Sequence, residues 1–125
     1  MADIVINGTS YPLKFGMRFL REVNARNSVP VEGLKGVQEN VGLRLMIAEL
    51  IEGSPEALAD CIFIANKTEE PKLNAKMIDE YIEDEGTDIE ELFDKVLNFL
   101  EKANATAKTY KALTEALEQA QAAQE

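Results

Sequence analysis

The sequence predicts a mainly α-helical protein of about six helices with an N-terminal β-hairpin. Two observations lead to this prediction. Apolar residues flank the dipeptide Asn7-Gly8, which favours the tight turn of a hairpin. The rest of the chain carries apolar residues at helical spacing, without strand–helix–strand alternation. We expect a single domain over residues 1–125, with a hairpin over 3–15, a helical core over 16–103 and a detached or frayed C-terminal helix over 104–125.

The N-terminal hairpin must pack against another element, because a two-stranded hairpin is only marginally stable alone in water. Two interpretations are open. In the first, its apolar side chains cap the helical core. In the second, an edge or face of the hairpin brings subunits together, so that the protein is a homo-oligomer. The residues concerned are Ile4, Ile6, Leu13 and Phe15. We expect no third strand, because no later segment shows strand periodicity.

The first two helices are expected over about residues 16–26 and 37–52, joined by a loop over residues 27–36 that is rich in turn formers. The second helix is apolar around much of its circumference. Such a helix is typically central to a core or covered by a partner. Its apolar residues are Val41, Leu43, Leu45, Met46, Ile47, Leu50 and Ile51.

Capping residues predict where the next three helices begin. Ser54 followed by Pro55 begins one helix, whose buried face should carry Leu58, Cys61, Ile62 and Ala65. Asn74 is expected to cap a short helix. Thr87 with Glu90 fits a capping box, ahead of an amphipathic stripe that runs from Ile89 to Leu100 and should pack in the core.

The last helix should follow the triplet Asn104-Ala105-Thr106, which also matches a glycosylation acceptor but is expected to act as a helix cap. Its apolar residues form a heptad seam about two heptads long, too short to predict a coiled coil. Core packing and contact with a partner are equally compatible with this seam. The seam consists of Tyr110, Leu113, Leu117 and Ala120.

The charge is unevenly distributed. The net charge is −10, yet residues 1–48 contain six basic and four acidic residues, against seven basic and nineteen acidic residues in 49–125. Repulsion from phosphate argues against nucleic-acid binding by the acidic part. No apolar run approaches the ~18 residues of a membrane span, and the N-terminus has no signal segment. Cys61 is the only cysteine, which excludes an internal disulfide and fits a reducing compartment.

Residue types needed for common catalytic and metal sites are missing. The chain has no histidine and no glycine-rich phosphate loop. The run from Asp79 to Asp94 contains nine carboxylates, but aligning Gly86 with an EF-hand loop puts Tyr81 and Leu92 at the first and last ligand positions. We therefore predict no enzyme activity, no cofactor and no metal site.

Three segments, in order, carry a resemblance to a known family: "INGTSYPLKFGMRFLREVN", "VPVEGLKGVQENVGL" and "ALADCIFIANKTEEPKLNAKMIDEYIEDEGTDIEELFDKVLNFLEKANATAKT". From Ile4 to about Thr109 the chain resembles the tail assembly chaperones of long-tailed phages and prophages of Gram-positive bacteria. The resemblance implies binding to the tape measure protein, which stays soluble until the tail tube forms around it. It also implies contacts with the major tail protein and with a frameshift-extended form of the chaperone itself.

The resemblance further implies action in the host cell cytoplasm and absence from the mature virion. The expected partner-binding residues are Val41, Leu45, Tyr110, Leu113 and Leu117. The alternative is a generic acidic helical binding module, or regulator, that sequesters a basic partner. That alternative predicts salt-sensitive binding, whereas the chaperone hypothesis predicts apolar, helix-to-helix contacts that survive moderate salt.

Overall fold

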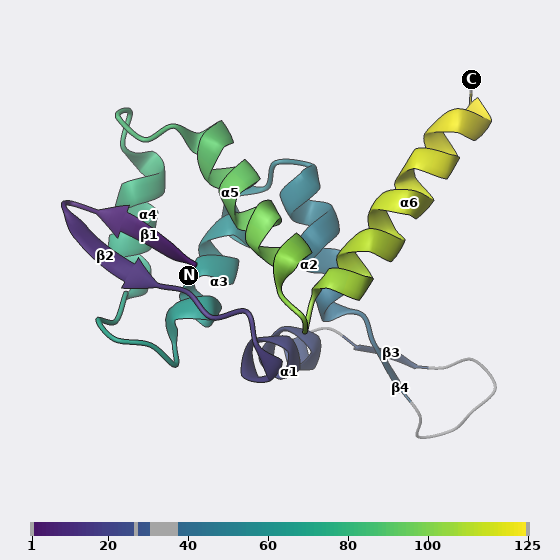
Figure 1. The fold of residues 1–125 in the computed structure, drawn as a ribbon, viewed down its shortest axis with the longest axis horizontal. Coiled ribbons are helices and arrows are strands. Elements are labelled where there is room, and N and C mark those ends of the chain that lie inside the picture. The colour runs from purple at the N-terminus through teal and green to yellow at the C-terminus, as the bar shows by residue number, and fades with distance from the viewer. Residues whose placement is uncertain (1, 27, 31–37, 125) are drawn as a thin grey trace.

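A computed structural model describes residues 2–26, 28–30 and 38–124, in which there are six helices and two β-hairpins (Figure 1). This arrangement confirms the mainly α-helical fold with an N-terminal hairpin. The elements are β1 (Asp3–Ile6), β2 (Thr9–Pro12), α1 (Met17–Arg26), β3 (Ser28–Pro30), β4 (Gln38–Asn40), α2 (Gly42–Ile51), α3 (Pro55–Asn66), α4 (Ala75–Glu83), α5 (Ile89–Lys102) and α6 (Ala107–Gln124).

The N-terminal hairpin turns at Asn7 and Gly8, as the sequence predicts. Both residues have positive φ angles, 50° and 81°, which a tight two-residue hairpin turn requires. β1 and β2 pair antiparallel, with Ile4 opposite Tyr11. One face of the hairpin points into the core, where Ile4 and Tyr11 are buried. The hairpin therefore finds the packing partner that it needs for stability.

A second hairpin, β3–β4, shows that the prediction of no third strand is wrong and corrects the predicted bounds of a loop and a helix. Residues 28–30 belong to the segment expected to be a loop, and 38–40 to the segment expected to be helical, yet they pair antiparallel, with Ser28 opposite Asn40. α2 consequently begins at Gly42. Each strand has three residues, too few to show strand periodicity in the sequence. The rest of the expected loop, and Val37, lie outside the described residues.

α3 lies at the centre of the core, in contact with α1, α2, α4 and α5. Its predicted inner face is completely buried: Leu58, Cys61, Ile62 and Ala65 are each 0% exposed. α5 contributes Leu92, Val96 and Leu100 from the stripe identified in the sequence. Burial of this apolar surface supplies most of the favourable free energy of folding.

α1 and α2 approach each other closely at Gly42. A Cβ atom on Gly42 would lie 1.9 Å from the backbone oxygen of Val23, so no side chain fits there. At the same crossing, the Leu43 amide donates a hydrogen bond to Oδ1 of Asn24, at 2.9 Å. Val41, at the N-cap position of α2, has no capping side chain of its own, so a side chain from α1 satisfies this helix end.

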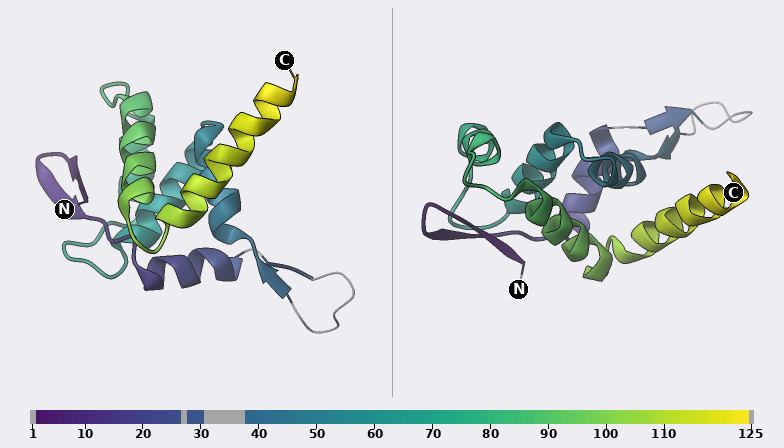
Figure 2. Two further views of the ribbon diagram at one scale, coloured as in Figure 1. Left: turned by 45° about the vertical axis from the view of Figure 1, so that its right-hand side comes forward. Right: turned by 90° about the horizontal axis from the view of Figure 1, so that it is seen from above.

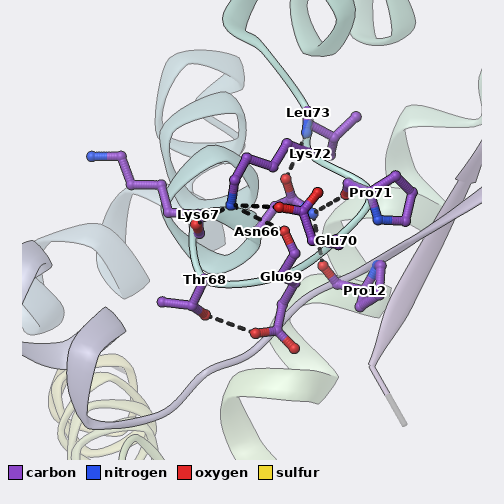
Figure 3. Close-up of polar contacts among 9 residues, drawn as sticks. All are labelled: Pro12, Asn66, Lys67, Thr68, Glu69, Glu70, Pro71, Lys72 and Leu73. Carbon is purple, nitrogen blue, oxygen red and sulfur yellow. Dashed lines mark hydrogen bonds and ion pairs between the residues drawn. The ribbon is translucent and has the colours of Figure 1, made fainter.

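Asn66, at the end of α3, ties the N-terminal hairpin to the loop after α3 (Figure 3). Its Nδ2 donates to the carbonyl oxygens of Pro12, at 3.0 Å, and Pro71, at 3.1 Å. Its Oδ1 accepts from the amide of Leu73 at 2.6 Å. Asn66 is only 1% exposed, and a buried polar side chain of this kind is stable only when its hydrogen bonds are made.

Helix caps mostly follow the sequence. Ser54 and Asn74 accept from the amides of Ala57 and Met77, as expected. α5 differs from the prediction, because Asp88, not Thr87, caps it by accepting from the amide of Glu91. The Thr87 hydroxyl instead donates to the carbonyl oxygen of Tyr81, and Asp88, the next residue, occupies the N-cap position.

The α5–α6 corner contains the buried Thr106. Its hydroxyl donates a hydrogen bond to the carbonyl oxygen of Leu100 at 2.6 Å. This bond satisfies a carbonyl group in the last turn of α5. Thr106 therefore makes a helix-end hydrogen bond, as the triplet predicts, but at the end of α5. Tyr110 and Leu113, at the start of α6, pack against the core. Beyond them α6 points away from the other helices, toward the end of the molecule that also carries β3–β4 (Figures 1 and 2).

Candidate binding surface

The expected partner-binding residues lie on α6, on α2 and, for Val41, at the N-cap position of α2, and the two helices are in contact. Leu45 on α2 and Leu117 on α6 are 42% and 43% exposed. Val41, Tyr110 and Leu113 are half-buried. The exposed leucines are therefore free to contact a partner, whereas Tyr110 and Leu113 also anchor α6 to the core.

The outer half of α6 is a free helical arm, which we define as residues 115–122. Every residue in this arm is exposed. Its Ala, Leu, Glu and Gln residues favour a helix intrinsically, but most helical stability in proteins comes from tertiary packing. A helix with no packed face gains stability from any partner that covers one side of it.

The residues considered for self-association occupy a different position. Ile4, Ile6, Leu13 and Phe15 are between 1% and 6% exposed and belong to the core. Their side chains cannot meet a second copy unless the hairpin leaves the core. These four side chains pack in the core of the single chain, and association of copies through the hairpin stays a prediction. On the outer face, Val5 is 53% exposed.

Two grooves were not found from the sequence. The first, of about 500 Å³, is largely apolar and lies where the N-terminal segment meets α5, with Leu13, Phe15, Phe99 and Ala103 in its wall. The second, of about 920 Å³, runs along α1 and has four basic side chains: Lys14, Arg18, Arg21 and Lys67. We call the second the basic groove. The closely spaced arginines of α1 were the sequence signal that could have revealed it.

A family model of the phage tail assembly chaperone protein TAC matches residues 3–115. The chain belongs to this family. The match covers both α1 and α2 and ends inside α6, after Leu113 and before Leu117. No curated protein and no solved structure matches the chain.

Membership in a chaperone family implies a role other than catalysis. Complete burial raises the pKa of the Cys61 thiol far above its usual range, so Cys61 remains a neutral thiol within the core. Among the residues that the structure describes, no group of three or more His, Cys, Asp or Glu could hold a metal ion.

Tyr110, which packs the start of α6 against the core, has a raised pKa. Partial burial, together with the nearby carboxylates of Glu101 and Asp94, raises the pKa of its hydroxyl. These groups disfavour the phenolate, so the start of α6 packs best with neutral Tyr110. Within the described ranges, no helix of the chaperone is long and apolar enough to cross a bilayer.

Proposed function

We propose that this chaperone binds the tape measure protein of its phage and keeps it soluble while the tail tube assembles. The contact surface in this proposal comprises the exposed face of α2 and the free arm of α6. The observation that carries it is the pair of exposed leucines, Leu45 and Leu117, on two contacting helices of a family member. An amphipathic helix of a partner could cover both through side chains at helical spacing.

The expected affinity of one copy is modest. Apolar burial contributes on the order of 25 cal/mol per Å², and part of that gain is lost in ordering the partner and the free arm. Many copies bound along one long chain would nevertheless cover its apolar stripes. The net charge of −10 then opposes aggregation of the covered complex.

We further propose that the chaperone acts in the host cell cytoplasm, meets the major tail protein as the tube grows, and is absent from the finished virion. A frameshift-extended form of the same chain would act beside it. Mass spectrometry of purified virions tests the last step of assembly. Stoichiometric amounts of the chaperone in intact virions would contradict its release.

Co-expression tests the main proposal. The tape measure protein should be insoluble alone and soluble with the chaperone, and the two should co-purify. Leu45→Asp and Leu117→Asp should each reduce solubilisation, because each places a charge on the proposed contact. Ala75→Asp is the matched control, since it adds the same charge at an exposed position of α4, outside the proposed contact, without removing a large apolar side chain.

The outcomes separate the candidate surfaces. Loss with Leu45→Asp alone would restrict the contact to α2. Full activity of both leucine variants would move the contact to another surface, for which the apolar groove near Phe99 is the next candidate. Failure of the wild-type chaperone to solubilise or co-purify, even with any extended form supplied, would refute the function.

A second candidate function rests on the nine exposed carboxylates between Asp79 and Asp94. A module that sequesters a basic partner would bind through them and lose affinity as salt rises, because exposed charges are screened. Contacts through Leu45 and Leu117 would survive moderate salt. Measuring co-purification across a salt series therefore distinguishes the two functions.

A further inference from the structure

The basic groove is a concentration of positive charge in an acidic protein. Lys14, Arg18, Arg21 and Lys67 line it, with Glu22 as its single carboxylate. Nζ of Lys67 lies 2.9 Å from a carboxylate oxygen of Glu22 and is thereby neutralised. Lys14, Arg18 and Arg21 are exposed and form no ion pair with any residue in the described ranges.

The groove also offers apolar contact. Met17 lies in its wall and is 52% exposed, whereas Phe19, which also lines the groove, is 3% exposed and belongs to the core. An ordinary solvated helix face would carry its charges on a convex surface. Here three unpaired cations surround a concave surface with an exposed thioether, which is the arrangement expected for a site that receives an acidic protein segment.

A complementary surface exists on the same chain. We define the acidic end as residues 79–94, the last part of α4, the following turn and the start of α5. All nine of its carboxylates are exposed, and it contains no Lys or Arg. Within the described ranges this run makes one ion pair, between Glu80 and Lys76 at 3.9 Å, and Lys76 lies in the turn of helix before it. Most of the charge of the acidic end is thus uncompensated locally.

The two surfaces cannot meet within one molecule. In Figure 1 and in the left view of Figure 2, the turn between α4 and α5 lies at the upper left of the molecule and α1 lies at the bottom. From this separation and the charge complementarity, we infer that the basic groove receives the acidic end of a second copy of this chain.

Such a contact joins two different surfaces, so each copy keeps one free groove and one free acidic end. A heterologous contact of this kind extends into an open chain of copies unless its rotation closes a ring. It uses none of the residues assigned to tape measure binding, and it can be tested without that partner. The inference therefore stands or falls separately from the proposed function.

Sedimentation velocity of the full chain tests the inference. Association should be strong at an ionic strength of about 0.01 M, where charges act over about 30 Å, and should disappear near 1 M, where they act over about 3 Å. The groove variant Arg18→Glu/Arg21→Glu and the end variant Glu83→Lys/Glu85→Lys should each weaken association at least about tenfold. Glu83 and Glu85 are chosen because Asp84 holds the turn through the amide of Gly86.

An equimolar mixture of the two variants provides the decisive arm. Each variant alone lacks one of the two complementary surfaces, but in the mixture the unmodified groove of the end variant can receive the unmodified acidic end of the groove variant. Association should therefore return in the mixture. Lys108→Glu/Lys111→Glu is the matched control: it changes the net charge by the same amount as the groove variant, at exposed positions of α6, and should associate like the wild type.

Several results would overturn the inference. These are a wild-type protein that stays monomeric at low salt, a groove variant that associates normally, or a mixture that stays monomeric. Tight binding of duplex DNA by the wild type that is lost in the groove variant would assign the groove to a polyanion instead. Circular dichroism and melting of every variant establish that the fold is intact before association is compared.

Discussion

Replacing Gly42 with alanine reverses the effect that helix propensity predicts. Gly42 is the first residue of α2, and alanine there would ordinarily favour the helix by up to about 1 kcal/mol. In this fold the new Cβ would lie 1.9 Å from the oxygen and 2.6 Å from the carbonyl carbon of Val23. Both atoms belong to the backbone of α1, so no side-chain rotation relieves the overlap.

The cost has two parts, because α1 and α2 must move apart to make room for the new Cβ. Forced repacking of this kind typically costs about 1 to 3 kcal/mol. Separation also stretches the 2.9 Å hydrogen bond from the Leu43 amide to Asn24, and an unpaired buried donor costs about 1 to 3 kcal/mol more. We expect a net loss of about 3 kcal/mol in the free energy of unfolding, a large share of the ~5 to 15 kcal/mol of a typical domain.

Thermal and urea unfolding of Gly42→Ala measure this loss. The control is Gly86→Ala, where the nearest atom to the new Cβ would be Asp84 Oδ1 at 3.5 Å, an ordinary contact. Asn24→Ala, which removes only the hydrogen bond, should lose less than Gly42→Ala. If Gly42→Ala unfolds at the same urea concentration as Gly86→Ala, or at a higher one, the close α1–α2 contact is not rigid and the reasoning is refuted.

Other predictions use the same unfolding measurements. Asn66→Asp keeps the acceptor for Leu73 but removes both donors, so it should lose about 3 kcal/mol, while exposed Asn98→Asp should change little. Cys61 should resist a thiol reagent in native buffer and react fully in urea; rapid native labelling would show that α3 opens easily. Because its pKa is raised in the folded state, Tyr110 holds its proton more tightly there, so stability should fall as pH rises above about 10, and Tyr110→Phe should flatten that fall. Calcium or a chelator should leave the melting temperature unchanged, and a large calcium-dependent rise would reveal a site in the acidic end.

Local patterns in the sequence predicted most of the fold. Asn7 and Gly8 specified the first turn because they adopt its positive φ angles. Ser54 and Asn74 specified two helix starts because each side chain accepts a hydrogen bond from an amide three residues later. β3 and β4 escaped detection because strands of three residues carry no period. The contacts of Gly42 and Asn66 could not be foreseen, since they join segments that are distant in the sequence.

The candidate surface was predictable only in outline. The apolar circumference of α2 was compatible with a central place in the core or with cover by a partner, but the helical period alone could not say that Leu45 would be exposed and Met46 buried. The basic groove depends on residues from three places, the segment before α1, α1 itself and the end of α3. Such a groove emerges only when the chain has folded.

The free arm of α6 makes the two chain ends unequal as attachment points for probes and tags. A helix rises about 1.5 Å per residue, so the last residues of α6 are carried well clear of the core. A fluorophore or affinity tag there leaves folding undisturbed and reports directly on whatever covers the arm. At the other end, the Leu13 amide donates to the carbonyl oxygen of Ala2, one residue before β1. A fusion at that end adds its bulk beside the hairpin, so biochemical work on this chaperone should label the C-terminal side and leave the N-terminal side unmodified.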